Sequence, residues 1–381
     1  MQGKHSNVLK WLAAWVARER LRKRLRGLVR WDPLTNPEPG CTVVLGMCSR
    51  LPHVLLANLR CLAASHWPDF KELVIAVDCR GFVGSESYES TARKLLPGLP
   101  IRFLYYSETE AKLAEQLKLP YVYSWLSWCL AIRQVKTEHI LIHDYDALIL
   151  GRGLEQRYEE FCRSKAKVQG ISWYAVNGFV PADRLVTTFE QFCDVVWLRS
   201  LEPLDLFNKV GIKNGRSVDY DTTLDIQDRL LTEAERQMTP MNEDELVHPS
   251  QMIHQYTMFR RHPAKALPCF AMPMIPFFSY LGGFEEAIRR AASSLERSSP
   301  SDVDLLGDAT RINLTQLNSA QVDWSLKQMV QTCLKLAIPP QQDFYQYGLA
   351  LYKCVRAPAS AHWVGDFTPG QRRWISLARE S

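Results

Sequence analysis

The sequence predicts an α/β protein with a mostly parallel central sheet and a helical C-terminal addition. Short apolar runs alternate with longer amphipathic segments between residues 41 and 144, and two of these runs end in an aspartate. From about residue 266 the composition shifts to a proline-rich stretch followed by helical patterns. Alternation of this kind is typical of parallel strands covered by helices, and such sheets bind ligands beyond the carboxyl ends of their strands.

Composition sets the broad class of the protein. The 381 residues are 46% hydrophobic and 23% charged, which suits one large globular domain with additions, or two domains. The ten cysteines form no C-x-x-C pair, a distribution that indicates a reducing compartment rather than structural zinc. No run of about 18 apolar residues is present, and the N-terminus lacks the apolar core of a signal peptide. We therefore expect a cytoplasmic protein without a membrane-spanning helix.

The positive charge is concentrated near the N-terminus. Residues 1–32 hold nine Lys or Arg and two acidic residues, a net charge of +7, whereas the whole chain has +5. The rest of the chain is therefore slightly acidic, and we expect no nucleic acid as a partner. Residues 8–31 mix Leu and Trp with Arg and Lys, as helices on membrane surfaces do. Two arrangements stay open: a peripheral membrane contact through residues 8–31, or a helix packed on its own domain by its apolar stripe.

The predicted strands and helices begin after a proline-rich linker at residues 31–40. A buried strand at 41–48, a helix at 51–67 and a second buried strand at 71–78 form a βαβ unit. The alternation continues with a strand at 101–107, a helix at 123–137 and a strand at 139–144.

Beyond residue 150, the predicted strands and helices no longer alternate regularly. A strand with a loop is predicted at 168–180, and helices are predicted at 182–201, 220–238, 284–297 and 322–337. We therefore expect three parts: an amphipathic N-terminal helix with its linker at 1–38, a main domain at 39–265, and a mainly helical region at 266–381.

Two carboxylates stand one residue apart in "HILIHDYDALIL" (139–150), where Asp144 ends a predicted strand and Asp146 follows. Charged groups are rarely buried unless they are paired or bound to a metal. The two side chains can project from the same side of an extended turn, and together they make an oxygen site for Mg²⁺ or Mn²⁺ and thereby for a diphosphate. The alternative is a turn whose carboxylates bond to the backbone.

Three strand ends together resemble the glycosyltransferase A fold, which is Rossmann-like, and specifically the family 2 glycosyltransferases. The matching segments are "TVVLGMCSR" (42–50), "ELVIAVD" ending in Asp78, and "ILIHDYD". The resemblance implies that Asp146 binds the metal, that Asp144 contacts the metal shell or the ribose, and that Asp78 contacts the nucleotide.

The same resemblance implies a nucleotide-binding loop after the first strand, with Cys48 and Arg50 as its contacts. Family members often place a small residue and another acid after Asp-x-Asp, whereas this chain has Ala147 and Leu148. The implied activity is that of a hexosyltransferase-like enzyme, with residues 39–265 as its nucleotide-sugar-binding domain. The implied donor is a nucleoside-diphosphate sugar, with a UDP-sugar favoured, and the acceptor is a saccharide or a lipid-linked molecule.

The segment "SVDYDTTLDIQDRL" (217–230) resembles the acidic motif in which an aspartate acts as general base in these enzymes. An inverting transfer needs a base that removes the proton of the acceptor hydroxyl. Asp221 is the first candidate and Asp219 the second. Capping of the following helix by these aspartates is the alternative interpretation.

A histidine downstream of the base often returns to the metal in enzymes of this fold, and imidazole is a suitable ligand for Mn²⁺. His248 in "ELVHPSQMIHQY" (245–256) is the better candidate, and His254 is the second. His143 precedes Asp144 and should point to the other face of its strand. The aromatic residues Trp173 and Tyr174 are candidates for stacking on a sugar.

Three rival functions remain to be weighed. The string "DYDTT" (219–223) matches the nucleophile motif of haloacid-dehalogenase-type phosphatases, but the residues before it are polar rather than a buried strand. A sugar-nucleotide pyrophosphorylase should have a glycine-rich loop after its first strand, and "LGMCSRLPH" (45–53) has a single glycine. A non-catalytic, nucleotide-binding relative of the fold is the third alternative.

Overall fold

The computed structural model describes the chain except for residues 1, 66, 173–176, 264, 356–362 and 364. The chain divides into two compact units, each built from separate segments. The first, here called the sheet unit, comprises Met1–Ser49, His66–Tyr145 and Leu154–Met241. The second, the helical unit, comprises Arg50–Ser65, Asp146–Gly153 and Asn242–Ser381.

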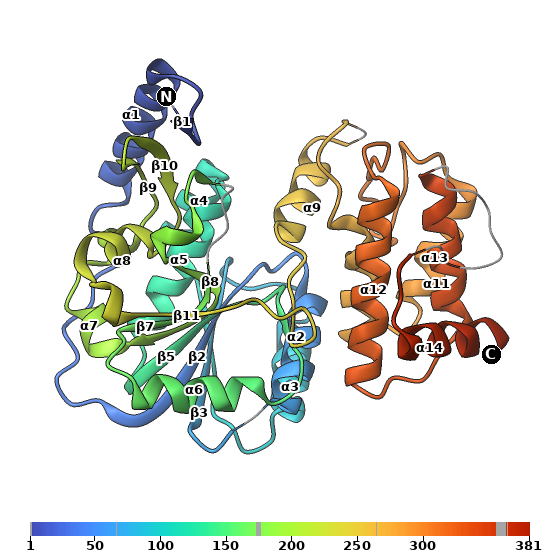
Figure 1. The fold of residues 1–381 in the computed structure, drawn as a ribbon, viewed down its shortest axis with the longest axis horizontal. Coiled ribbons are helices and arrows are strands. Elements are labelled where there is room, and N and C mark those ends of the chain that lie inside the picture. The colour runs from blue at the N-terminus through green and yellow to red at the C-terminus, as the bar shows by residue number, and fades with distance from the viewer. Residues whose placement is uncertain (1, 66, 173–176, 264, 356–362, 364) are drawn as a thin grey trace. The chain divides into compact units, whose positions relative to one another are not determined.

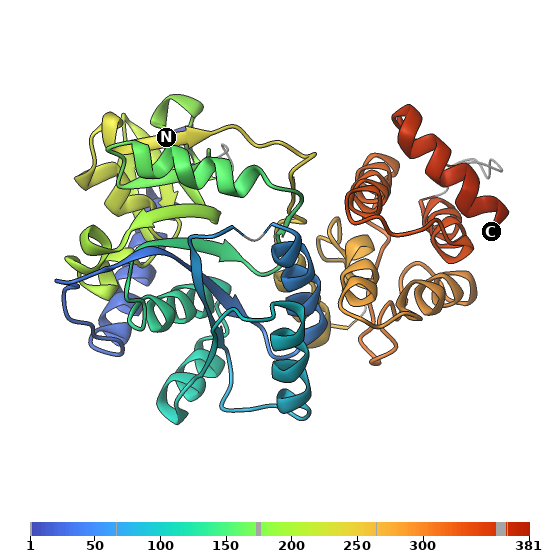
Figure 2. The ribbon, with the colours of Figure 1, turned by 90° about the horizontal axis from the view of Figure 1, so that it is seen from below.

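A seven-stranded sheet forms the centre of the sheet unit, with strand order β11-β7-β8-β5-β2-β3-β4 (Figures 1 and 2). Strand β8 is antiparallel to both of its neighbours, and the other pairs are parallel. The predicted α/β class with a mostly parallel sheet is therefore confirmed. The strands are β2 (Glu38–Met47), β3 (Phe70–Val77), β4 (Ile101–Tyr105), β5 (Thr137–Asp144), β7 (Val168–Ser172), β8 (Val186–Asp194) and β11 (Arg236–Thr239).

The central strands are continuous apolar runs because both of their faces are covered. In β2 and β3, the residues Val43–Leu45 and Leu73–Val77 are fully buried, as expected for parallel strands between helical layers. Helices lie on both faces of the sheet (Figures 1 and 2). The helices of this unit are α1 (Val8–Leu25), α3 (Ser85–Leu95), α4 (Glu108–Leu117), α5 (Pro120–Ile132), α6 (Gly153–Arg163), α7 (Val195–Arg199) and α8 (Leu224–Leu230).

The strand order reverses between β2 and β5. The chain runs outward from β2 through β3 to β4, and β5 then lies on the other side of β2. In open α/β sheets, ligands bind in the crevice that opens at the carboxyl ends of the strands at such a reversal. Asp144 is the last residue of β5, and Cys48 follows the last residue of β2. The topology therefore brings two predicted site segments to this point.

A second, three-stranded sheet in the sheet unit has the order β1-β10-β9, with β1 at Gln2–Gly3, β9 at Lys209–Lys213 and β10 at Arg216–Tyr220. Helix α1 packs beside β9. The expectation that no strand precedes "DYDTT" is wrong, because β10 includes its first residues and buries Ser217 and Val218. The string nevertheless follows a strand of this small sheet, and not one of the parallel central sheet.

Two predicted helices in the sheet unit are wrong. Residues 182–201 form β8 and the short helix α7, because the β-branched and aromatic residues of "VTTFEQFC" favour a strand between β5 and β7. In the region 220–238, α8 has seven residues and is followed by a 3₁₀ turn and β11. Parallel pairing of β11 with β7 outweighs the helical pattern there.

The helical unit confirms the predicted C-terminal helices at 284–297 and 322–337. Its elements are α2 (Pro52–Ala64), β6 (Leu148–Ile149), β12 (Leu246–Val247), α9 (Met252–Arg261), α10 (Ile275–Leu281), α11 (Ala287–Arg297), α12 (Ser319–Lys335), α13 (Gln342–Cys354) and α14 (Pro369–Glu380). Among the residues that the structure describes, no helix is both long and apolar enough to cross a membrane.

The two units differ from the three parts expected at 1–38, 39–265 and 266–381. Helix α2 belongs to the helical unit because it packs on α10 and β6 of the same unit. The approach is close at Gly282, where a Cβ atom would lie 2.2 Å from the carbonyl oxygen of His53. This contact joins segments far apart in sequence, and linear composition does not reveal it.

Candidate metal and catalytic site

Three of the predicted ligands lie together. One carboxylate oxygen of Asp144, one of Asp146 and a ring nitrogen of His248 all lie within 4.8 Å of one another. Asp144 is half-buried, and the side chains of Asp146 and His248 are only 10% and 8% exposed. Within the described part of the chain, no other group of three His, Cys, Asp or Glu side chains has this arrangement.

A short antiparallel ladder brings His248 to Asp146. Leu148 of β6 pairs with Val247 of β12, so the residue that follows β12, His248, comes to lie opposite Ala147. Its Nε2 lies 3.9 Å from Oδ1 of Asp146. The convergence follows from strand register, although the two residues are far apart in sequence.

Burial dominates the electrostatics of Asp146 and raises the pKa of its carboxyl to about 7. Hydrogen bonds from its own backbone N–H and from that of Ile253 act in the opposite direction and favour the ionised form. Ile253 lies in the first turn of α9, where backbone N–H groups favour an anion. A cation at this point would compensate the buried charge. Two carboxylates and an imidazole fit Mn²⁺ or Mg²⁺.

Asn58, which sequence reasoning missed, holds the segment after Asp146. It is fully buried on α2, and its Nδ2 donates a hydrogen bond to the carbonyl oxygen of Ala147 at 2.6 Å. From the end of the same helix, the hydroxyl of Ser65 donates to the carbonyl oxygen of Gly151 at 2.6 Å. In the sequence, Asn58 is the only amide residue within the apolar helical stretch "HVLLANLRCL", and this could have identified it as a residue with a specific hydrogen bond.

The predicted nucleotide-binding residues follow β2 and β3. The backbone N–H of Ser49 donates to Oδ1 of Asp78 at 2.8 Å, so the Asp78 side chain fastens the loop after β2. Cys48 in that loop is half-buried, and Arg50 is exposed. Strand β2 lies between β5 and β3 and runs parallel to both, so this loop and Asp78 share the sheet edge at which Asp144 lies.

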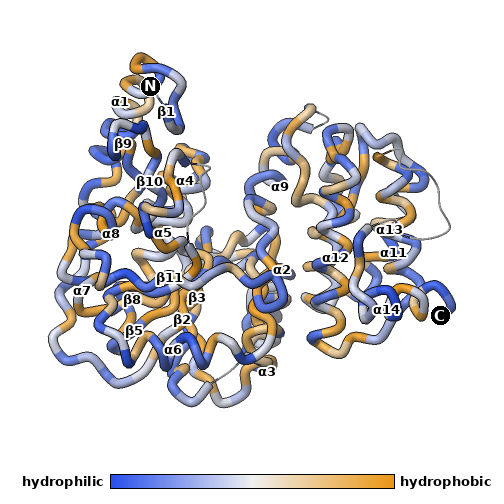
Figure 3. Tube along the Cα trace, viewed as in Figure 1, coloured by the Kyte–Doolittle hydropathy of each residue, from blue (hydrophilic) through white to orange (hydrophobic). Residues whose placement is uncertain are grey.

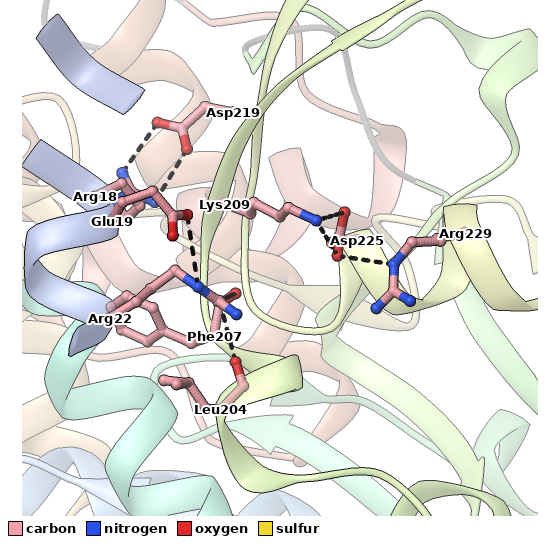
Figure 4. Close-up of polar contacts among 9 residues, drawn as sticks. All are labelled: Arg18, Glu19, Arg22, Leu204, Phe207, Lys209, Asp219, Asp225 and Arg229. Carbon is pink, nitrogen blue, oxygen red and sulfur yellow. Dashed lines mark hydrogen bonds and ion pairs between the residues drawn. The ribbon is translucent and has the colours of Figure 1, made fainter. Parts of the chain in front are cut away.

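The two base candidates have different surroundings. Asp219 on β10 forms an ion pair with Arg18 of α1 at 3.2 Å (Figure 4). Asp221 follows β10 and is half-buried, and its Oδ1 accepts hydrogen bonds from Asn208 Nδ2 at 2.7 Å and from the Thr222 N–H at 2.8 Å. Burial raises the pKa of the Asp221 carboxyl, and the bonds from Thr222 and Asn208 lower it. Asn208 is a second residue that sequence reasoning missed.

The turn that carries Asp221 is tied to the carboxyl edge of the central sheet. The hydroxyl of Thr223 donates to Oε1 of Gln191 on β8 at 3.1 Å. On β8, Glu190 pairs with His143 of β5, and β8 begins four residues earlier, so it extends beyond the end of β5. Thr223 has φ 70°, a strained value for a β-branched residue.

The other histidines do not join the three-ligand group. His143 is fully buried, and its Nδ1 lies 2.6 Å from the carbonyl oxygen of Phe189. His254 is half-buried on α9, where burial lowers the pKa of its imidazole, and the group contains His248 instead. Trp173 and Tyr174 lie outside the described residues.

Comparisons with known proteins give structural matches alone. No protein-family model matches the chain. No curated protein matches its sequence. Similar solved structures include the galactosyltransferase LgtC in complex with donor and acceptor sugar analogs, at 14% identity and a TM-score of 0.33. That match covers 43% of this chain and spans only 62% of LgtC.

Two further matches cover most of this chain. The mannosyltransferase PcManGT from Pyrobaculum calidifontis, in complex with GDP-Man and Mn²⁺, has 14% identity and a TM-score of 0.35 over 86% of this chain and 96% of that one. S. aureus TarS 1-349 in complex with UDP-GlcNAc has 12% identity and a TM-score of 0.32 over 87% and 95%. Because these TM-scores are low, we base the fold assignment on the order and directions of the strands. They form the mostly parallel α/β sheet that is expected from the resemblance to the glycosyltransferase A fold.

Proposed function

We propose that the chain is a metal-dependent glycosyltransferase that moves a sugar from a nucleoside-diphosphate sugar to an acceptor hydroxyl with inversion. The observation that carries the proposal is the grouping of Asp144, Asp146 and His248 at the carboxyl end of β5, beside the reversal of strand order. A cation site at this edge suits a nucleoside diphosphate, because the parallel strands end there and the diphosphate needs its charge neutralised.

The metal would be held by Asp144, Asp146 and His248 as Mn²⁺ or Mg²⁺. When bound, such an ion neutralises the negative charge of the departing diphosphate. The loop with Cys48 and Arg50 would contact the nucleotide, and Asp78 would keep that loop in place through Ser49. A UDP-sugar is the favoured donor, and the acceptor is a saccharide or a lipid-linked molecule.

Asp221 would take the proton of the acceptor hydroxyl. Its Oδ1 already accepts two N–H groups, so Oδ2 is the oxygen that would receive the proton. The raised pKa of this carboxyl suits a general base, because proton transfer is most effective when the pKa approaches the working pH. Asp219 is a poorer base since Arg18 neutralises it.

The first test measures release of nucleoside diphosphate from a panel of nucleotide sugars with and without Mn²⁺. Wild-type protein should release the nucleotide only when metal is present, and Asp146→Ala should abolish release. Asp302→Ala removes an exposed acid elsewhere and serves as the control, with unchanged release. Full activity of Asp146→Ala would refute the metal assignment. Binding of UDP without any release would favour the non-catalytic alternative.

The second test concerns the base and the stereochemistry. Asp221→Asn should lose sugar transfer while still binding the donor, because the substitution changes neither the metal ligands nor the loop after β2. Wild-type turnover in this variant would reject Asp221 as the base. The anomeric configuration of the product, followed by NMR, should be opposite to that of the donor, and a retained configuration would overturn the inverting mechanism.

A further inference from the structure

Helix α1 has an apolar side that its own unit leaves exposed. Val8, Leu9, Leu12 and Trp15 are 58%, 78%, 43% and 40% exposed. Val8, Leu12 and Trp15 share one face of the helix, since they are spaced by four and three residues. These residues fill the first two turns of α1, and Figure 3 shows the beginning of the helix as hydrophobic.

Other residues of α1 anchor the helix to the sheet unit. The indole Nε1 of Trp11 donates to the carbonyl oxygen of Gly211 at 3.1 Å, and Leu21 and Leu25 are buried. Arg18 pairs with Asp219, and Arg22 donates to the carbonyl oxygens of Leu204 and Phe207 (Figure 4). Of the exposed apolar residues, Trp15 stacks on the anchoring Trp11, with ring centroids 6.5 Å apart, whereas Val8, Leu9 and Leu12 are not among these anchors.

Basic side chains of the same helix, most of them in its later turns and at the residue after it, supply free positive charge. Five exposed basic side chains form no ion pair with any described residue: Lys10, Arg20, Lys23, Arg24 and Arg26. The helix has a single acidic residue, Glu19, and this lies 3.7 Å from Arg22. The exposed side of α1 thus combines large apolar side chains at its beginning with uncompensated cations mainly at its end.

We propose that α1 docks this exposed side on an anionic lipid surface. Leu and Trp side chains gain by leaving water for the boundary between headgroups and acyl chains, and Lys and Arg are attracted to anionic headgroups. The anchored side would keep the sheet unit at a fixed orientation to the surface. A nucleic acid would use the cations but gain little from four exposed aliphatic and aromatic residues, so lipid fits both features best.

The docked part is smaller than the region 8–31 expected from the sequence. Trp31 donates its indole N–H to the carbonyl oxygen of Leu201 at 2.7 Å, and Val29 is buried, so these residues belong to the packed side. Packing on the domain and contact with a surface are therefore not alternatives, because different residues of one helix serve them. This proposal is independent of the sugar-transfer chemistry.

The test is flotation of the full-length protein with vesicles of phosphatidylcholine alone and of phosphatidylcholine mixed with phosphatidylglycerol. We expect binding to the mixed vesicles and not to the neutral ones, and a loss of binding at high salt. The triple variants Leu9→Ala/Leu12→Ala/Trp15→Ala and Lys23→Ala/Arg24→Ala/Arg26→Ala should each bind at least about tenfold more weakly.

The control is Leu334→Ala/Leu377→Ala, which removes one exposed leucine from α12 and one from α14, and it should bind as wild type. Unchanged melting temperatures would show that the triple variants fold. The proposal is overturned if mixed vesicles do not bind, if neutral vesicles bind equally well, or if either triple variant binds as wild type. Dimerisation lost in the Leu9→Ala/Leu12→Ala/Trp15→Ala variant, without vesicle binding, would identify a second copy as the occupant and also overturn it.

Discussion

Two buried asparagines hold the segments that carry the candidate site. Asn58 bonds to the carbonyl oxygen of Ala147, next to Asp146, and Asn208 bonds to the carboxylate of Asp221. Neither contributes charge, and each fixes the position of an acidic residue on another element. In both, the side-chain amide N–H donates to an oxygen atom of the segment that it holds.

Substitution Asn208→Ala should change both stability and the pH profile of transfer. It removes a donor to Asp221 and the acceptor of the Thr222 hydroxyl, so we expect a loss of about 1–3 kcal/mol in unfolding free energy. The bond from Asn208 lowers the pKa of Asp221, so its loss should move the acid limb of the rate profile to higher pH. Thr222→Val keeps that bond and should leave the acid limb in place; an equal displacement in both variants would contradict the role of Asn208.

Asp221→Asn should become more stable relative to wild type as pH rises. Burial raises the folded-state pKa of Asp221, so its contribution to stability is full below the unfolded pKa, near 4, and is lost as pH rises through the folded pKa. The amide does not titrate, and its Oδ1 can still accept from Asn208 and Thr222. Urea unfolding of both proteins from pH 4 to 8 measures the difference. A difference that falls with pH would show that Asp221 is not buried as described.

The charged candidates were predictable from sequence, whereas the residues that position them were not. Asp144 and Asp146 form a local pattern at the end of an apolar run, and His248 follows a short strand, so each carries a signal within a few residues. Asn58 and Asn208 bond to partners 89 and 13 residues away. Those pairings depend on register and helix placement, which local pattern does not contain.

Among the elements, strand β8 lies in the segment 182–201, for which the sequence predicts a helix. It inserts antiparallel between β5 and β7 and carries Gln191, to which the turn of Asp221 is bonded. It also carries Glu190, fully buried and paired with Arg157 of α6 through two contacts of 2.6 and 3.1 Å. This ion pair joins a helix to the strand that supports the candidate base.

Arg157→Met should destabilise the protein by about 3–5 kcal/mol, because it leaves the buried Glu190 carboxylate without its partner. The double variant Arg157→Met/Glu190→Met should regain much of that loss, since neither charge remains buried. Arg163→Met, on the exposed side of the same helix, should change stability by no more than about 1 kcal/mol. Urea titrations measure all three. Equal stability of the single and double variants would contradict a strong coupling between the two charges.

At the scale of the whole molecule, the chain crosses repeatedly between the two units. Residues 50–65 and 146–153 belong with the C-terminal helices, although the segments around them form the sheet unit. The proposed ligands are Asp144 at the end of β5, Asp146 just after it, and His248, which follows β12 and is distant in sequence. Sequence patterns identified the strands β2, β3, β4, β5 and β7 and several of the helices. They did not reveal this interleaving, because it is decided by contacts such as that of α2 with α10.

Removal of the metal should lower the free energy of unfolding of the chain. An ion that binds the native state at a hundredfold excess over its Kd raises the unfolding free energy by about 2.7 kcal/mol, so thermal unfolding in Mn²⁺ should occur several degrees above that in chelator. His248→Ala should lose most of this gain, because it removes one of the three ligands. Asp302→Ala, which alters an exposed acid, should keep it. An equal Mn²⁺ response in His248→Ala and wild type would remove His248 from the metal site, even if sugar transfer were abolished for another reason.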